Sequence, residues 1–440
     1  MIVNNGDGGS VKNDHHQPAG NLAATRRCLH PAVVPDPCRS RWPPPVTPNS
    51  YPVACLGTTS SELLRRGVGT RCSVRLLVVF GGPAVAPGDG GNIGWERLMR
   101  DLSDAKRGYV TRRISGWGRA RLAGFVPQPR LGDVVAAEVI GLGELEFLED
   151  VHGRRARLYP GDVVLGAYGK RYATDFYEGY LPVGRFAQLL TAGGLVGLVA
   201  SAHVRRGRPT ELAVLGTVTD GSGSALSLEQ FAVSTPPRAA GVALGTVVVV
   251  GSSMNAGKTT TVAGLVRGWS RAGLRVGAGK VTGSGSGKDR WMYLDAGAAA
   301  VADFLDFGMA STFGYPVERL RTTMVEVRDI LVAEHAEVVV LEIADGLLQE
   351  ETRALAGDLP GFADVVVLAV SDALGAVAGV NILSDLGVPV GAVSGVVTAS
   401  PLAAREAAAA TGLEVLSPAE LSAGAALDLL SAAVPVGQAS

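Results

Sequence analysis

Glycine, lysine and threonine stand together just after an apolar run, as Gly257, Lys258 and Thr259. The run at residues 247–250 is four valines, and Gly251 follows it directly. A glycine-containing turn that opens a helix directs backbone N–H groups and the positive end of the helix dipole at one point. A lysine adds a point charge there, and a threonine hydroxyl is a ligand for Mg²⁺. These residue types in this order predict a binding site for nucleotide phosphates.

The glycine spacing differs from that of the most common phosphate-binding loop, or P-loop. Five residues separate Gly251 from Gly257 where the common pattern has four, and Ser252 takes the usual first-glycine position. The alternative is a glycine-rich turn that opens a helix by coincidence. The order of strand, loop and helix favours the P-loop, with Lys258 as a catalytic residue on the β- and γ-phosphates. The residues expected to bind the nucleotide are Gly251, Ser252, Ser253, Met254, Asn255, Ala256, Gly257, Lys258, Thr259 and Thr260.

Alternating strands and helices surround this loop in residues 241–440. Apolar runs typical of strands buried on both faces alternate with segments of helical period. The sequence therefore predicts an α/β fold, a P-loop NTPase domain with a mostly parallel sheet and helices on both faces. The expected strands are 242–250, 274–281, 337–343, 363–370 and 388–398, and the expected helices start near 257 and cover 321–336, 374–387, 402–410 and 418–433.

The part of the chain before this domain divides into two regions. Residues 1–74 are rich in proline and lack a persistent period, so we expect a disordered tail or an upstream extension from a misplaced start codon. Residues 75–235 have short β-rich runs punctuated by Gly, Pro and Asp, which predicts a small β-rich, barrel-like domain of unknown role. The expected strands and turns are a strand at 73–80, strands within 132–149 and 153–169, a hairpin around 220–223, and a linker at 234–241.

Composition narrows the classes of partner. The 40 basic and 41 acidic residues nearly cancel, so nucleic acid and anionic membranes are not expected partners. No apolar run reaches the roughly 18 residues that cross a bilayer, and the chain has no signal-peptide pattern, which favours a cytoplasmic protein. All four cysteines lie in the first 72 residues and none forms a C-x-x-C pair, so a zinc site has little support.

At the loop, the sequence resembles the dethiobiotin synthetase family of P-loop enzymes, which also has five residues between the two glycines. Residues 278–287, AGKVTGSGSG, are similar to that family's strand ending in Lys-Pro-Val-x-Ser/Thr-Gly. Residues 341–348, LEIADGLL, are similar to its Val-Glu-Gly-Ala-Gly-Gly-Leu. The resemblance covers under half of the chain. Uncharacterised proteins with a similar loop and an added N-terminal domain match equally well. The strand at 132–139 weakly resembles those of oligonucleotide-binding barrels, beside the plainer interpretation as an ordinary β-domain.

The resemblance implies roles for several charged residues. Lys280 would be a second catalytic lysine that contacts the transferring phosphoryl group, with a solvated strand-end lysine as the alternative. Thr259, Glu342 and Asp295 would hold Mg²⁺, with Asp289 competing for the place of Asp295. A plain helix-terminal aspartate is the other interpretation of Asp295.

The sequence also departs from the family. Val281 replaces a proline, and Ile343 and Asp345 replace glycines that lie near the family's substrate, so the substrate stays open. Thr398 stands where the family often has an asparagine that contacts the base, and no guanine-reading Asn-Lys-x-Asp signature occurs. Adenine is therefore the default base, and ATP with Mg²⁺ the expected cofactor.

Two classes of function fit these features. The first is an ATP-dependent enzyme, a ligase or phosphotransferase, that phosphorylates a small carboxylate or carbamate substrate. The second is a nucleotide-hydrolysing switch, a cofactor-insertion factor or a regulatory factor. Ser252 and Ser253 stand where partition ATPases of this class carry an extra lysine, which argues against their dimer mechanism. A homodimer of another kind stays open.

Overall fold

The computed structural model describes residues 102–235 and 245–433, and all of these belong to one compact unit, residues 85–440. Within these ranges, no helix is long and apolar enough to cross a membrane. Three predictions fall outside the described residues: the tail at 1–74, the strand at 73–80, and the linker from residue 236 onward.

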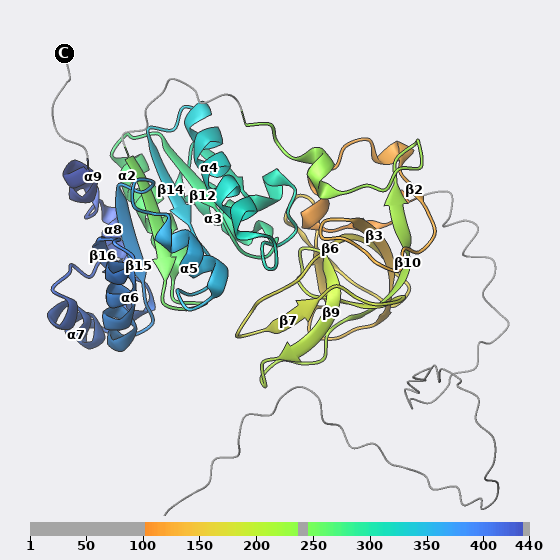
Figure 1. Cartoon of the computed structure of the whole chain (residues 1–440), viewed down its shortest axis with the longest axis horizontal. Coiled ribbons are helices and arrows are strands. Elements are labelled where there is room, and N and C mark those ends of the chain that lie inside the picture. Colours follow the sequence, from red (N-terminus) through yellow and green to blue (C-terminus); the bar gives the residue numbers. More distant parts are fainter. Residues whose placement is uncertain (1–101, 236–244, 434–440) are drawn as a thin grey trace, which may run out of the picture. The chain divides into compact units, whose positions relative to one another are not determined.

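The first described part is rich in strands (Figure 1). The strands β6, β3, β10, β8 and β9 pair in that order, and β9 pairs in turn with β6, so the ring closes into a small barrel. The elements are β1 (Lys106–Arg107), η1 (Tyr109–Thr111), η2 (Trp117–Arg119), β2 (Arg121–Leu122), β3 (Val134–Gly141), β4 (Phe147–Glu149), β5 (Arg155–Arg157), β6 (Val163–Tyr168), β7 (Tyr177–Tyr180), β8 (Phe186–Leu189), β9 (Leu195–Ala202), β10 (Glu211–Thr219) and η3 (Leu228–Phe231).

Strand β3 shows how the barrel is filled. Val135, Ala137 and Val139 belong to a fully buried cluster with members from all five ring strands, which is the barrel core. Val134 and Ala136, on the opposite face of the strand, belong to a second cluster that continues into the C-terminal domain. Because successive side chains of a strand point to opposite faces, one strand serves both cores. The predicted barrel is thus present, although strand order alone assigns it no ligand.

The predicted hairpin around residues 220–223 is only half formed. Strand β10 leads into a turn in which the Gly223 amide donates to the Asp220 carbonyl at 3.1 Å. The returning segment bridges Thr219 through Ala225, and the Leu226 amide donates to the Val218 carbonyl at 2.8 Å. It then bridges Asp133 through Ser227 and enters η3, so the predicted turn is present but its returning arm is too short to form a strand.

The C-terminal part is an α/β domain with a parallel six-stranded sheet, as the sequence predicts (Figure 1). Its strand order is β13-β12-β14-β11-β15-β16. The strands are β11 (Gly245–Gly251), β12 (Val276–Lys280), β13 (Ala300–Asp303), β14 (Val338–Glu342), β15 (Val365–Ala369) and β16 (Val390–Ser394). The helices are α2 (Lys258–Arg271), α3 (Gly287–Ala296), η4 (Phe304–Phe307), α4 (Val317–Ala333), α5 (Glu350–Gly357), α6 (Ala373–Asp385), η5 (Val396–Ala399), α7 (Pro401–Thr411), α8 (Pro418–Ala423) and α9 (Leu427–Ala433).

The central strand β11 is buried on both faces. Val247 and Val249 pack in a cluster with residues of α2, α3 and α8, whereas Val248 and Val250 pack with residues of α4, α5 and α6. A parallel strand that is covered on both faces has apolar residues at consecutive positions, which explains the four valines at residues 247–250. This arrangement brings the carboxyl ends of β11, β12 and β14 to the same edge of the sheet, where a ligand of an open α/β sheet binds.

Three elements of this domain, β13, α3 and α5, were not predicted from the sequence. Strand β13 and helix α5 are too short for a periodic hydrophobic pattern, and helix α3 has no continuous apolar stripe. One predicted helix is in fact two. The helix predicted at 418–433 is two helices, α8 and α9, because Gly424 adopts a left-handed φ of 101° between them.

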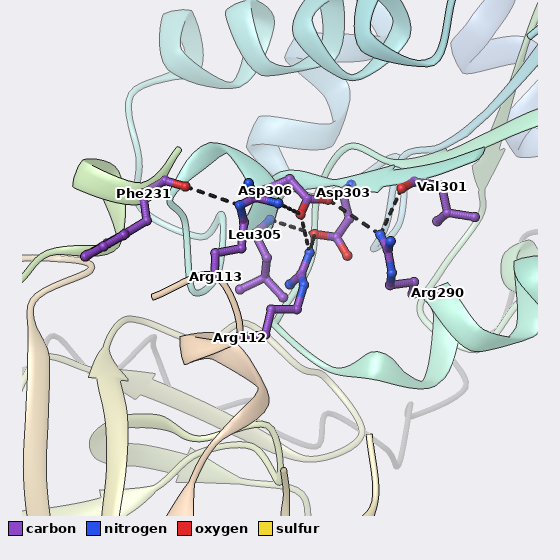
Figure 2. Close-up of polar contacts among 8 residues, drawn as sticks. All are labelled: Arg112, Arg113, Phe231, Arg290, Val301, Asp303, Leu305 and Asp306. Carbon is purple, nitrogen blue, oxygen red and sulfur yellow. Dashed lines mark hydrogen bonds and ion pairs between the residues drawn. The ribbon is translucent and has the colours of Figure 1, made fainter. Parts of the chain in front are cut away.

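Buried charges join the two parts of the compact unit (Figure 2). The Arg112 guanidinium, just after η1, donates to Asp303 at 2.9 Å and to Asp306 at 2.8 Å. These three side chains are each 10% exposed or less. Arg290 of α3 lies 3.7 Å from Asp306, and the more exposed Arg113 lies 3.3 Å from it. The barrel therefore contacts the α/β domain through a fixed ionic network.

Candidate functional site

The loop between β11 and α2 has the backbone that a phosphate-binding loop requires. Gly257 adopts a φ of 101° and Asn255 a φ of 62°, both in the left-handed region that favours glycine and asparagine. A Cβ on Gly257 would lie 2.8 Å from the Cα of Gly395, so the close approach also requires glycine. The Val396 amide donates to the Ala256 carbonyl at 2.9 Å and fixes the loop from the far side.

Lys258 turns back over the start of the loop. A Cβ on Gly251 would come within 2.8 Å of the Lys258 side chain, so the glycine leaves room for the lysine to pass. The ammonium donates to the carbonyls of Ser253 at 2.9 Å and Asp345 at 2.6 Å. Lys258 is 6% exposed and makes no ion pair with any described residue. Burial lowers its pKa, and the charges of Glu342 and Asp345 oppose that shift.

The second lysine is neutralised by two carboxylates. Lys280, at the end of β12, ion-pairs with Asp289 of α3 and lies 3.2 Å from Glu342 at the end of β14. Burial alone would lower the pKa of Lys280, but the two carboxylates outweigh it and raise the pKa. The buried Tyr293 hydroxyl donates to the other oxygen of Glu342. The fold thus brings the predicted Lys280 and Glu342 together. The charge of Lys280 is already paired with two carboxylates, and Glu342 already accepts from Tyr293.

A cavity of about 500 Å³ opens over the loop, within the range of small-ligand sites. Met254, Asn255, Gly257, Lys258, Thr259 and Thr260 of the predicted loop line it, together with Lys280 and Glu342. The other predicted loop residues, Gly251, Ser252, Ser253 and Ala256, do not line it. The Thr260 hydroxyl is bonded to the Gly257 carbonyl at 2.7 Å, and the Thr259 side chain is hydrogen-bonded to Tyr293.

The prediction that Asp295 completes a metal site needs correction. Asp295 is exposed in the last turn of α3 and does not line the cavity. Asp289, its competitor, lies near the start of the same helix and lines the cavity. Five residues separate the two aspartates, so they lie toward opposite ends of a ten-residue helix. The described residues hold no group of three acidic, histidine or cysteine side chains that could bind a metal by themselves.

Asp345 is an unusual residue at this edge of the sheet. Its backbone φ is 65°, in the left-handed region that residues other than Gly, Asn and Asp rarely adopt. Its side chain lines the cavity. Burial raises the pKa of its carboxyl to about 6, against the opposing charges of Lys258 and Lys280. A non-glycine residue held in this conformation at a cavity is a common feature of functional sites.

Some residues at the site could not be found from sequence patterns. Arg171, Tyr172, Asp175 and Phe176, from the barrel segment between β6 and β7, line the same cavity. No motif marks them, because their position depends on how the barrel packs against the α/β domain. Thr398, by contrast, donates to the Gly395 carbonyl at 2.7 Å and does not line the cavity.

Comparisons with known proteins add little to this geometry. No family model matches the chain, and no curated protein matches it. The signal recognition particle 54 kDa protein from Aeropyrum pernix K1 in complex with GDP is 21% identical, with 45% of this chain and 49% of that chain covered and a TM-score of 0.31. The receptor FtsY from Elizabethkingia anophelis in complex with GDP is 13% identical, with 48% and 69% covered and a TM-score of 0.30. Chloroplast FtsY from Physcomitrella patens is 15% identical, with 46% and 70% covered and a TM-score of 0.30.

The chain spans about half the length of the first of these proteins. At such TM-scores the likeness carries no argument about ligand or activity. None of the three is a dethiobiotin synthetase, so that resemblance stays a prediction. The P-loop fold rests on the sheet order and the loop of this chain itself.

Proposed function

We propose that the C-terminal domain binds a nucleoside triphosphate with Mg²⁺ and transfers its terminal phosphoryl group to a small carboxylate or carbamate. The observation that carries this proposal is the state of Lys258. Its ammonium is buried, borders the cavity and, among the described residues, donates only to backbone carbonyls. A buried cation without a carboxylate partner is costly unless an anion binds beside it, and phosphate oxygens are suitable anions.

Each group at the site has a part in this reaction. Helix α2 directs its N-terminal amides and dipole at the phosphates, and Lys258 places a charge on the β- and γ-oxygens. Lys280 is suited to bind the phosphoryl group that is transferred. To do so, the phosphoryl group competes with Asp289 and Glu342 for the Lys280 ammonium. The preference for adenine remains the default, since no residue of the described cavity distinguishes the bases.

The donors at the site fit a magnesium ion. The hydroxyl of Thr259 and the carboxylates of Asp289 and Glu342 are hard oxygen ligands that line one cavity. The Lys280 ammonium lies between the two carboxylates, which is where a positive charge is favoured. When bound, Mg²⁺ would neutralise charge on the phosphate oxygens. The protein's own groups would orient the phosphates and exclude water.

A nucleotide-dependent switch is the second candidate, and one contact favours it. The Asn255 side-chain amide, within the phosphate loop, donates to the Asp175 carboxylate of the barrel at 2.7 Å. A change in the loop on hydrolysis would reach the barrel through this bond. A switch should hydrolyse nucleotide slowly by itself, whereas a phosphotransferase should release phosphate only with its acceptor.

Two measurements test the proposal in sequence. A thermal-shift screen with Mg²⁺ and ATP, GTP or their diphosphates should show stabilisation of the full chain. Phosphate release is then measured with and without a panel of carboxylate and amine metabolites, the amines with bicarbonate. Release that depends on one acceptor supports the enzyme. Slow release that no acceptor changes supports the switch, and no stabilisation by any nucleotide contradicts both.

A further inference from the structure

One wall of the cavity belongs to the barrel and carries one arginine and one aspartate. The segment between β6 and β7 contributes Arg171, Tyr172, Asp175 and Phe176 to the lining. Its position is fixed from both sides. The Asp175 carboxylate accepts from Asn255 in the phosphate loop, and the Arg171 amide pairs with the Gly179 carbonyl in the barrel. The wall is therefore ordered where it meets the P-loop.

Arg171 has few partners of its own. One terminal nitrogen donates to the Leu190 carbonyl, and the guanidinium stacks on the Phe176 ring at 4.5 Å. Its Nε is buried without a hydrogen-bond partner, and its Nη2 donates to no described residue. Burial lowers the pKa of Arg171 to about 10, so the side chain is still protonated at neutral pH. A desolvated guanidinium with free donors is a strong site for an oxyanion.

The charges of the cavity lining are only partly paired. Among its carboxylates, Asp289 and Glu342 neutralise Lys280, Asp175 lies 3.7 Å from Arg206, and Asp345 makes no ion pair with a described residue. Lys288 is exposed to solvent. Lys258 and Arg171 are the partly or fully buried cations of the lining that make no ion pair with a described residue. They come from different domains and border the same space.

The two cations line the same cavity as Asp345, whose carbonyl accepts from the Lys258 ammonium at 2.6 Å. In a P-loop, the lysine ammonium lies beside the β- and γ-phosphates. An arginine with unpartnered donors that borders the same cavity as this lysine is a suitable ligand for a phosphate group bound there.

We infer that Arg171 binds the terminal phosphate of the nucleotide, so that the barrel and the α/β domain together form one composite site. The inference rests on the proposed nucleotide function. It gives the barrel a role in distinguishing a triphosphate from a diphosphate. A guanidinium fork held over a phosphoryl group also offsets the charge that develops during transfer.

The test compares Arg171→Met with Arg206→Met in the full chain. Both arginines stack on Phe176 at 4.5 Å, but only Arg171 lines the cavity. Loss of packing on Phe176 is therefore common to both variants, as is loss of one charge near Asp175, whereas loss of a cation that lines the cavity is specific to Arg171→Met. Thermal unfolding of each variant checks that the fold is retained. Arg171→Lys, which keeps the charge and loses the fork, serves if the methionine variant does not fold.

Calorimetry with Mg²⁺ and either ADP or a non-hydrolysable ATP analogue gives the readout. We expect Arg171→Met to weaken the triphosphate analogue by about tenfold or more and to change ADP by less than about twofold. Arg171→Lys should weaken the analogue by a smaller factor, and Arg206→Met should change neither ligand by more than about twofold. Equal losses for both ligands, or equal effects of the Arg171 and Arg206 variants, would overturn the inference. Wild-type protein that binds no nucleotide would overturn the proposed function and the inference with it.

Discussion

Two loops face each other across the cavity, and they differ in how they can be recognised. The P-loop, between β11 and α2, carries its chemistry in consecutive residues, so a strand, a glycine turn and Lys258 identify it directly. The barrel segment around Arg171 has no such pattern, and its part in the site depends on tertiary packing alone. A local motif thus locates the phosphates, whereas the opposite wall becomes visible only in the folded molecule. Substitutions on each wall should therefore separate the contribution of the P-loop to nucleotide binding and turnover from that of the barrel segment.

The largest effect is expected from breaking the ionic junction that holds the walls together. Arg112→Met should lower the free energy of unfolding by about 3 kcal/mol, because it leaves Asp303 and Asp306 buried without their main cation. Arg113→Met is the matched control. Its side chain is 40% exposed, so a loss of less than about 1 kcal/mol is expected. Urea unfolding measures both, and equal losses would show that the junction is not held by the buried arginine.

On the P-loop wall, removing one carboxylate should separate chemistry from binding. Glu342→Gln should keep nucleotide affinity within about tenfold, since phosphate contacts dominate binding. Turnover should fall about a hundredfold or more, comparable to the loss of one preorganised electrostatic group. Asp295→Asn, on the exposed end of α3, should leave both unchanged. Calorimetry and phosphate release provide the two readouts, and unchanged turnover in Glu342→Gln would remove Glu342 from the site.

A smaller, pH-dependent effect is expected at Asp345. Its pKa of about 6 lies above the usual value near 3.9, so the folded state holds the proton more tightly than the unfolded state. Wild-type stability should therefore fall as pH rises from about 4 to about 6, and Asp345→Asn should remove that loss. Asparagine also tolerates the left-handed backbone, so it adds little strain.

The expected difference between Asp345→Asn and wild type is about 1–2 kcal/mol in favour of the variant at pH 7, after allowance for partial exposure. It should shrink toward zero at pH 4. Urea unfolding across this pH range measures it. A difference that does not depend on pH would mean that the carboxyl does not titrate in this window.

The sequence predicts the sheet better than it predicts the site. Apolar runs such as 247–250 define buried strands without ambiguity, since no other element needs so many consecutive valines. The sequence offered both Asp295 and Asp289 and could not choose between them, because their helix, α3, has no apolar stripe that marks where it begins. Only Asp289 lines the cavity. Tyr293, which bonds Glu342, was missed for the same reason.

The central claim is that the loop from Gly251 to Thr260 binds nucleotide phosphates through Lys258. Calorimetric titration of the full chain with Mg²⁺ and ATP, repeated with GTP, tests it most directly when wild type is compared with Lys258→Ala. Arg267→Ala, exposed farther along the same helix, controls for the loss of one positive charge on α2. We predict that wild type and Arg267→Ala bind at least one of the two nucleotides equally well and that Lys258→Ala shows no measurable binding while it remains folded. Wild-type affinity in folded Lys258→Ala would contradict the account.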